Sequence, residues 1–171
     1  MLRSPLKRYA ALAATAFVVM VAGAAPAGAS TTVAWNATLT EPIGGPLHWP
    51  FECGPYSACS AGSGQVIELG HVQDLVLFGA CGDTCDVRTL TFTDGSTIVM
   101  HEVFSNYRTP GNSSHPTPRS RAKYGNPFSG DLNDTIVGGT GRFAGATGDA
   151  SGTVNVAGGI ATSRLSGVVT F

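Results

Sequence analysis

Charged residues are scarce in this sequence, and neither sign is in large excess. Only 12% of the 171 residues are Asp, Glu, Lys or Arg, and the formal net charge at pH 7 is −1. Proteins that bind nucleic acid or an anionic membrane surface normally carry a basic patch. The composition therefore argues against both kinds of partner.

The sequence also lacks a hydrophobic segment long enough to cross a membrane. Its longest apolar run, Tyr9 to Val21, has about 13 residues, whereas about 20 are needed. This run follows three basic residues and precedes the small residues Ala27 to Ala29, a pattern typical of a secretory signal peptide. Residues 1–29 are therefore predicted to be cleaved and the protein to be secreted, with an uncleaved anchor as the alternative.

Cleavage after Ala29 would leave residues 30–171 as a single domain, with seven basic and eleven acidic residues. This mature chain has no sustained helical periodicity. Short alternating or apolar runs bounded by Gly, Pro, Asn or Asp predict β-strands instead. Strands are expected at residues 33–39, 65–69, 74–78, 87–93, 97–104, 135–137, 142–146, 152–157 and 160–171.

Two turn signals predict hairpins in this pattern. Asp94-Gly95 separates two strand-like runs and is a strong hairpin signal. Gly158-Gly159 is a suitable two-residue turn between the last two runs. About eight strands with hairpin connections and no crossover helices predict an all-β antiparallel barrel or sandwich, and glycines within the strands favour a closed barrel.

Two segments break the strand pattern. Residues 42–64 are predicted to be irregular. Residues 105–134 are polar, contain four prolines and are predicted to form a long loop, which would be either a solvated loop or a lid over an opening.

The four cysteines are Cys53, Cys59, Cys81 and Cys85. An even number of cysteines in an exported chain indicates disulfides. The short spacing within each pair favours Cys53–Cys59 and Cys81–Cys85, although four cysteines allow three pairings. The C-x2-C spacing typical of zinc sites is missing, and the four histidines show no ligand spacing, so no metal or other cofactor is predicted.

Common catalytic signatures are missing as well. The chain has no Gly-x-Ser-x-Gly nucleophile motif. Gly139-x-Gly141-x-x-Ala144 formally matches a dinucleotide-binding fingerprint, but the glycines that follow make a poor helix and too few residues remain for a βαβ unit. No catalytic residue is predicted from these motifs.

One glycine-rich segment is distinctive: Gly138, Gly139, Thr140, Gly141, Arg142 and Phe143. It resembles the turn between two barrel strands in the allene oxide cyclase and dirigent superfamily. The same motif also resembles one found in small exported bacterial proteins. The resemblance implies a calycin-like, eight-stranded antiparallel barrel in which the motif is architectural. In the enzymes of that superfamily, acidic, Tyr and Arg side chains inside the barrel bind a hydrophobic substrate, but no catalytic residue can be transferred to this chain.

A barrel interior could bring together polar side chains for acid–base chemistry, and the candidates for such an interior site are Glu68, His71, Asp74, His101, Glu102, Tyr107 and Arg142. His101 shares a strand face with apolar residues, and so does Glu102 on the opposite face. A charged group buried inside a barrel would have a shifted pKa and become a site candidate. The residues singled out as possible ligand contacts are Trp35, His71, His101, Glu102 and Tyr107.

Three functions remain open at this point. The first is a ligand-binding or structural barrel outside the cell, with a small hydrophobic ligand as the possible partner. The second is an isomerase or cyclase of the dirigent or allene oxide cyclase type. The third is a cell-envelope interaction protein that acts through surface loops. An open apolar cavity with converging polar groups would favour the second, and a solid barrel would exclude the first two.

Overall fold

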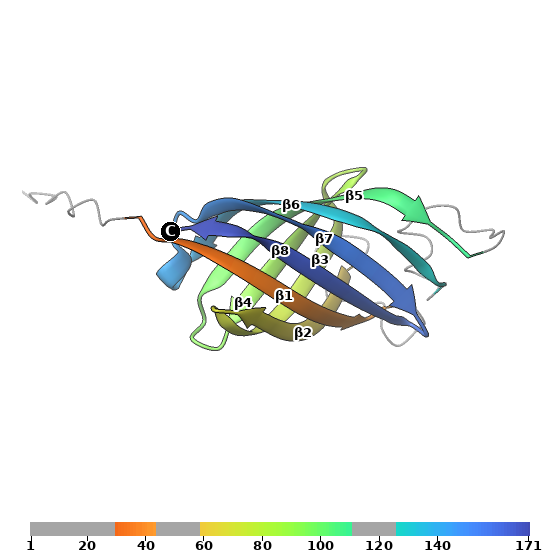
Figure 1. The fold of residues 1–171 in the computed structure, drawn as a ribbon, viewed down its shortest axis with the longest axis horizontal. Coiled ribbons are helices and arrows are strands. Elements are labelled where there is room, and N and C mark those ends of the chain that lie inside the picture. The colour runs from red at the N-terminus through yellow and green to blue at the C-terminus, as the bar shows by residue number, and fades with distance from the viewer. Residues whose placement is uncertain (1–29, 44–58, 111–125) are drawn as a thin grey trace, which may run out of the picture.

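The computed structural model describes residues 30–43, 59–110 and 126–171, which form one closed barrel of eight antiparallel strands (Figure 1). The strands are β1 (Thr32–Pro42), β2 (Cys59–Ile67), β3 (Gly70–Gly82), β4 (Cys85–Phe92), β5 (Thr97–Arg108), β6 (Phe128–Thr140), β7 (Thr147–Ala157) and β8 (Ile160–Thr170). A 3-10 turn, η1 (Gly141–Phe143), precedes β7. The prediction of an eight-stranded antiparallel barrel is confirmed.

Each strand pairs with its neighbours in the chain, and the first strand pairs with the last to close the barrel. The β1–β8 ladder runs from Thr32 opposite Thr170 to Pro42 opposite Ile160. Backbone hydrogen bonds between Thr31 and Phe171 extend it beyond the strand ends. The start of β1 and the end of β8 therefore lie together at one end of the barrel, beside η1 (Figure 1).

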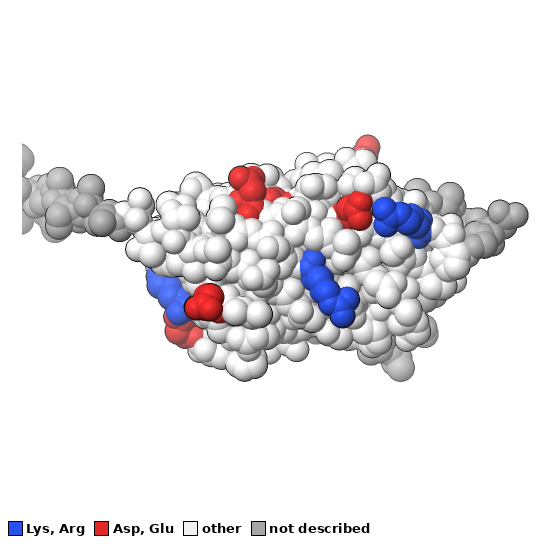
Figure 2. Space-filling model, viewed as in Figure 1, with Lys and Arg blue, Asp and Glu red and all other residues white. Residues whose placement is uncertain are grey.

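Alternation along the strands separates the interior from the outer wall. In β1, Trp35, Ala37, Leu39 and Glu41 are buried while the residues between them are exposed. Trp35, Ala37 and Leu39 belong to the apolar face that the alternation of this strand in the sequence predicts, so that prediction is confirmed. The outer wall carries few charges, and the face in Figure 2 shows only scattered blue and red side chains.

One end of the barrel is closed by aromatic side chains. Phe143 is fully buried, with its ring centroid 4.8 Å from that of Phe92 and 4.9 Å from that of Phe171. Arg142 covers this cluster from outside, with its guanidinium 4.7 Å from the centroid of Phe143. It also donates a 2.7 Å hydrogen bond to the backbone oxygen of Leu69. The glycine-rich segment therefore seals this end of the barrel.

The strand predicted at residues 142–146 is wrong, because the chain turns there. Residues 141–143 form η1, and Ala146 donates a backbone hydrogen bond to Phe143. Gly141 takes a φ of 61° and packs against Ser96, where a Cβ atom would lie 2.4 Å from the Ser96 hydroxyl. The compact turn directs the Phe143 side chain into the barrel.

The irregular segment predicted at residues 42–64 is also partly wrong, because β2 begins at Cys59. The inward positions of this strand include Gly62 and Gly64, which carry no side chain and hide the strand pattern. A Cβ at either glycine would lie 2.2 Å from a backbone oxygen of β1. Close approach of β1 requires these glycines.

The long loop predicted at residues 105–134 is shorter than expected. Strand β5 continues to Arg108, and β6 begins at Phe128. In β6 the inward residues Phe128, Gly130, Leu132 and Asp134 alternate with outward polar residues. Because the outward residues and two of the inward ones are not apolar, this part of the sequence resembles a polar loop. The rest of the predicted loop, residues 111–125, lies outside the described residues.

Both predicted hairpins are present. The side chain of Asp94 accepts a 2.9 Å hydrogen bond from the backbone of Ser96, and Gly95 donates to the backbone oxygen of Phe92. Only Gly95 of the Asp94-Gly95 pair has a positive φ, so the turn differs from the two-residue type that the pair usually signals. Gly158 and Gly159 connect β7 to β8 as expected.

The Cys81–Cys85 disulfide is present and joins the end of β3 to the start of β4. Cys59 is also disulfide-bonded, whereas its predicted partner, Cys53, lies outside the described residues. The predicted signal peptide, residues 1–29, lies outside them too. No helix among the described residues is long and apolar enough to span a membrane.

Candidate functional site

The end of the barrel opposite Phe143 contains a cavity of about 460 Å³. It lies between the end of β1, the β3–β4 hairpin, the end of β5, the start of β6 and the β7–β8 hairpin. Its apolar walls are formed mainly by Ile43, Val76, Phe78, Phe104, Tyr107, Phe128, Leu132, Val154, Val156 and Ala161. The barrel is therefore closed at one end and hollow at the other.

Aromatic rings line one side of this cavity. Phe104 and Tyr107 of β5 have ring centroids 5.9 Å apart, and both rings contact Phe128 of β6. Gly130 makes room for this group, since a Cβ there would lie 2.3 Å from the Phe104 ring. The glycine thus allows an aromatic wall that could pack against a flat apolar ligand.

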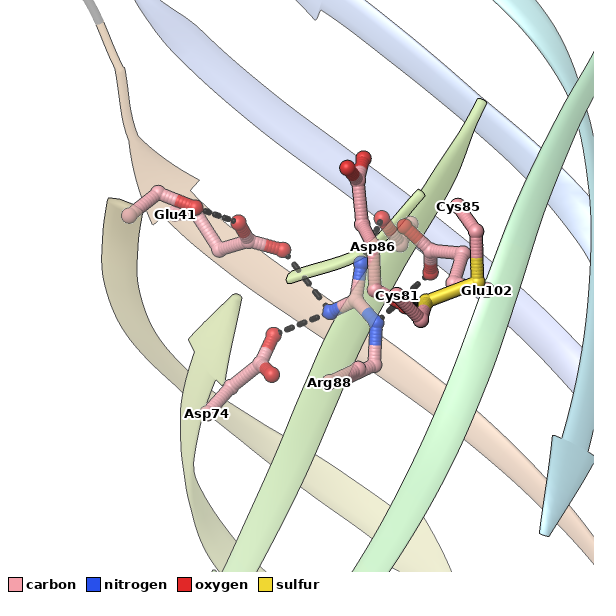
Figure 3. Close-up of polar contacts among 9 residues, drawn as sticks. Glu41, Asp74, Cys81, Cys85, Asp86, Arg88 and Glu102 are labelled. Carbon is pink, nitrogen blue, oxygen red and sulfur yellow. Dashed lines mark hydrogen bonds and ion pairs between the residues drawn. A yellow bond between two sulfur atoms is a disulfide. The ribbon is translucent and has the colours of Figure 1, made fainter. Parts of the chain in front are cut away.

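The floor of the cavity contains a buried arginine surrounded by carboxylates (Figure 3). Arg88 of β4 donates from Nε to Glu102 of β5 at 2.7 Å and from Nη1 to Glu41 of β1 at 2.9 Å. Nη1 also donates to Asp74 of β3. Adjacent strands bring Asp74, Arg88 and Glu102 together, whereas Glu41 comes from across the barrel.

Two serines complete the polar contacts of this cluster. Ser60 of β2 donates to Glu41, and Arg88 Nη2 donates to Ser163 of β8 at 3.5 Å. Arg88, Glu41, Glu102 and Ser163 all line the cavity. These polar groups therefore converge on the bottom of a space with largely apolar walls, which Asp83, Thr84, Asp86, Ser105 and Asn106 also line.

Arg88 and Glu41 form the charged pair of the cluster. Burial disfavours the charged guanidinium, but the carboxylates of Asp74, Glu102 and Glu41 outweigh it and hold the pKa of Arg88 well above its usual value. Burial likewise opposes ionisation of Glu41, yet the charge of Arg88 and hydrogen bonds from Ser60, Asp74 and Arg88 lower its pKa. Both groups are charged at neutral pH.

The other carboxyl groups hold protons more tightly. Burial raises the pKa of Asp74 well above its usual range despite the attraction of Arg88. Burial also raises the pKa of Glu102, again against the attraction of Arg88. The cluster thus combines one carboxylate whose pKa is lowered with two carboxyl groups whose pKa values are raised, because a single arginine cannot fully stabilise several buried negative charges.

Asp134 of β6 extends the cluster away from the cavity. It lies directly opposite Glu102 in the β5–β6 ladder, and both residues are buried. Burial and the negative charge of Glu102 raise the pKa of Asp134 to about 8. Neither Asp134 oxygen has a hydrogen-bond partner among the described residues.

The residues predicted to contact a ligand fall into two groups. Glu102 and Tyr107 line the cavity. Trp35 is buried outside the cavity lining, and His71 and His101 are exposed on the outer wall because alternation directs their side chains away from the interior. A ligand role for any of these five residues stays a prediction.

Among the further interior candidates, Asp74 joins the cluster, but Arg88, Glu41 and Asp134 were missed by the sequence reasoning. Each continues the inward alternation of a strand: Glu41 follows Leu39, and Arg88 precedes Leu90. A charged residue at an inward position of an otherwise apolar strand face was therefore the signal that could have identified these residues.

One group of possible metal ligands occurs among the described residues. The ligand atoms of Cys81, Cys85 and His101 lie within 4.8 Å of one another. The two sulfur atoms are joined in the disulfide and cannot bind a metal as thiolates. This cluster therefore carries no argument for a metal centre.

Comparisons with known proteins give no independent guide to this site. The chain matches no protein-family model, and no match is found among curated proteins or solved structures.

Proposed function

We propose that this protein binds a small apolar ligand in the open end of the barrel. The observation that supports the proposal is the 460 Å³ cavity, whose apolar and aromatic walls lead to a compact polar floor. This combination is typical of small-molecule sites, in which apolar walls provide affinity and a few polar groups fix orientation. Eight-stranded barrels are wide enough to hold one small ligand.

We also propose that the protein acts outside the cell. The signal-like pattern of residues 1–29 supports this, and the Cys81–Cys85 disulfide fits an oxidising environment. In this setting the protein would bind its ligand after export.

Native mass spectrometry of the protein recovered from the producing cells' medium tests ligand binding directly. A released small molecule is expected, and Ala161→Phe should abolish it because Ala161 faces the cavity. Thr162→Phe is the matched control, since the next residue of β8 is only partly buried and does not line the cavity. If the unmodified protein carries no ligand and binds no apolar probe, or if Ala161→Phe has no effect, the proposal is wrong.

A second candidate function is catalysis of a cyclisation or isomerisation. It is favoured by the convergence of Arg88, Glu41 and Glu102 on an open apolar cavity. A buried carboxyl with a raised pKa can act as a proton donor near neutral pH. Turnover that disappears in Glu102→Gln while ligand binding persists would favour catalysis over binding alone.

A further inference from the structure

Arg88 has one nitrogen that the cluster does not fully use. Its Nε donor is taken by Glu102, and its Nη1 donors are taken by Glu41 and Asp74. Nη2 carries two N–H groups. Its one contact among the described residues is the 3.5 Å contact with Ser163 Oγ. At least one donor of Arg88 is therefore available in a residue that lines the cavity.

Ser163 supplies a second donor beside it. Its side chain is fully buried and lines the cavity, and its oxygen accepts the contact from Arg88. No acceptor for its hydroxyl proton occurs among the described residues. An acceptor atom placed at the cavity floor could receive hydrogen bonds from both groups, and satisfying buried donors in this way favours a specific orientation.

The charges of the floor restrict what that acceptor can be. The positive charge of Arg88 is already balanced by Glu41, with which it forms a buried ion pair, and Glu102 contacts the same guanidinium. A ligand carboxylate would add negative charge beside these groups without an unpaired cation to receive it. A ligand ammonium would approach the guanidinium itself, and burying either charge is costly without a partner.

We propose that the ligand is a neutral apolar molecule that carries an acceptor oxygen, such as a ketone or ester carbonyl, held by Arg88 Nη2 and Ser163 Oγ. This inference rests on the proposed function. The apolar body of the ligand packs against the aromatic wall of Phe104, Tyr107 and Phe128, and its oxygen faces the floor. The polar floor thus selects an uncharged oxygen group rather than an acid or an amine.

Four probes with one ring system test the inference: naphthalene, acetylnaphthalene, naphthoate and aminomethylnaphthalene. Their affinities for the mature protein are measured by calorimetry at neutral pH. Acetylnaphthalene is expected to bind about tenfold or more tightly than each of the other three, since one satisfied hydrogen bond to a charged donor is worth about that much. Equal or tighter binding of naphthalene, naphthoate or aminomethylnaphthalene overturns the inference.

This result is distinguishable from failure of the proposed function. If the cavity binds none of the probes, ligand binding in the cavity fails and the inference fails with it. If naphthalene and the charged probes bind as well as acetylnaphthalene, the cavity binds apolar molecules but the polar floor does not select them.

Variants test the anchor separately. Ser163→Ala should weaken acetylnaphthalene binding about threefold to tenfold and leave naphthalene binding unchanged, because it removes one donor and little volume. Glu102→Gln should strengthen naphthoate binding by about tenfold, because it removes one negative charge beside Arg88. Asp149→Asn, an exposed carboxylate on β7, is the matched control and should change neither. Unchanged probe preferences in both floor variants would contradict the anchor.

Discussion

Glu102 and Asp134 face each other across the β5–β6 ladder, with both side chains inside the barrel. Two carboxyl groups at such a pair of positions cannot both be ionised without strong repulsion. Burial and this repulsion together raise the pKa of Asp134 to about 8, compared with an ordinary value of 3.8. The ladder register creates a proton-binding site that neither strand has alone.

Asp134→Asn should change how stability depends on pH. Between about pH 4 and pH 8, folded Asp134 holds a proton that the unfolded chain releases, so this residue lowers stability by about 1.4 kcal/mol per pH unit. The variant removes this contribution. The difference in unfolding free energy between variant and parent, measured in urea, should thus rise in favour of the variant from pH 4 to pH 8 and level off above it.

Asp149→Asn is the control for this experiment, because it removes an exposed carboxylate from the neighbouring strand β7. Its stability relative to the parent should stay nearly constant over the same pH range. A flat difference for Asp134→Asn as well would show that Asp134 is ionised normally in the folded protein.

Arg88→Met should destabilise the barrel strongly at neutral pH. It leaves Glu41, Asp74 and Glu102 buried without their cation, and breaking a buried ion pair in this way typically costs about 3–5 kcal/mol. The loss should be smaller near pH 4, because the carboxyl groups can then be buried as neutral acids. Urea unfolding at both pH values measures the difference.

Arg164→Met provides the comparison, since Arg164 is exposed on β8. It should change stability by less than about 0.5 kcal/mol at either pH. If Arg88→Met were equally mild at neutral pH, the carboxyl groups would not depend on Arg88 for their stability.

The sequence predicts the strand alternation better than it predicts the cluster. The inward face of β1 is evident from Trp35, Ala37 and Leu39, and Glu41 continues it. What the sequence lacks is the register between strands. The contact of Glu41 with Arg88 depends on how far each strand is shifted when the barrel closes, because β1 and β4 are not neighbours. A shift of two residues would keep every face and separate the pair.

The missed strand segments have a similar cause. The inward positions of β2 include Gly62 and Gly64, and β6 includes Gly130. Glycine removes the apolar signal from the buried face, so only the polar outer residues remain visible. These glycines are required by atoms of a neighbouring strand or by the Phe104 ring. Such requirements become apparent only when the strand pairing is known.

Phe143→Ala should cost about 3–5 kcal/mol of unfolding free energy. The side chain is fully buried between Phe92 and Phe171, so its removal leaves a cavity at the closed end. Phe143→Leu should recover part of the loss by filling some of that space. Thermal or urea unfolding measures both, and equal stabilities of the Ala variant and the parent would contradict a role in closing the barrel.

Gly62→Ala should prevent normal pairing of β1 and β2. The added methyl group would lie 2.2 Å from the backbone oxygen of Thr40, which cannot move without disturbing the ladder. Overpacking of this kind costs about 1–3 kcal/mol. The matched variant is Gly138→Ala, because a Cβ at Gly138 meets nothing within 4 Å and its φ is not positive.

Urea unfolding of the two glycine variants measures this effect directly. Gly138→Ala should be close to neutral, while Gly62→Ala should lose stability and alter the acceptor position of Glu41, whose Cγ lies 2.8 Å from the added Cβ. Since Glu41 balances the charge of Arg88, Gly62→Ala should also weaken the binding of acetylnaphthalene to the protein that remains folded. Equal stability of the two variants would mean that β1 does not approach β2 closely enough to require a glycine.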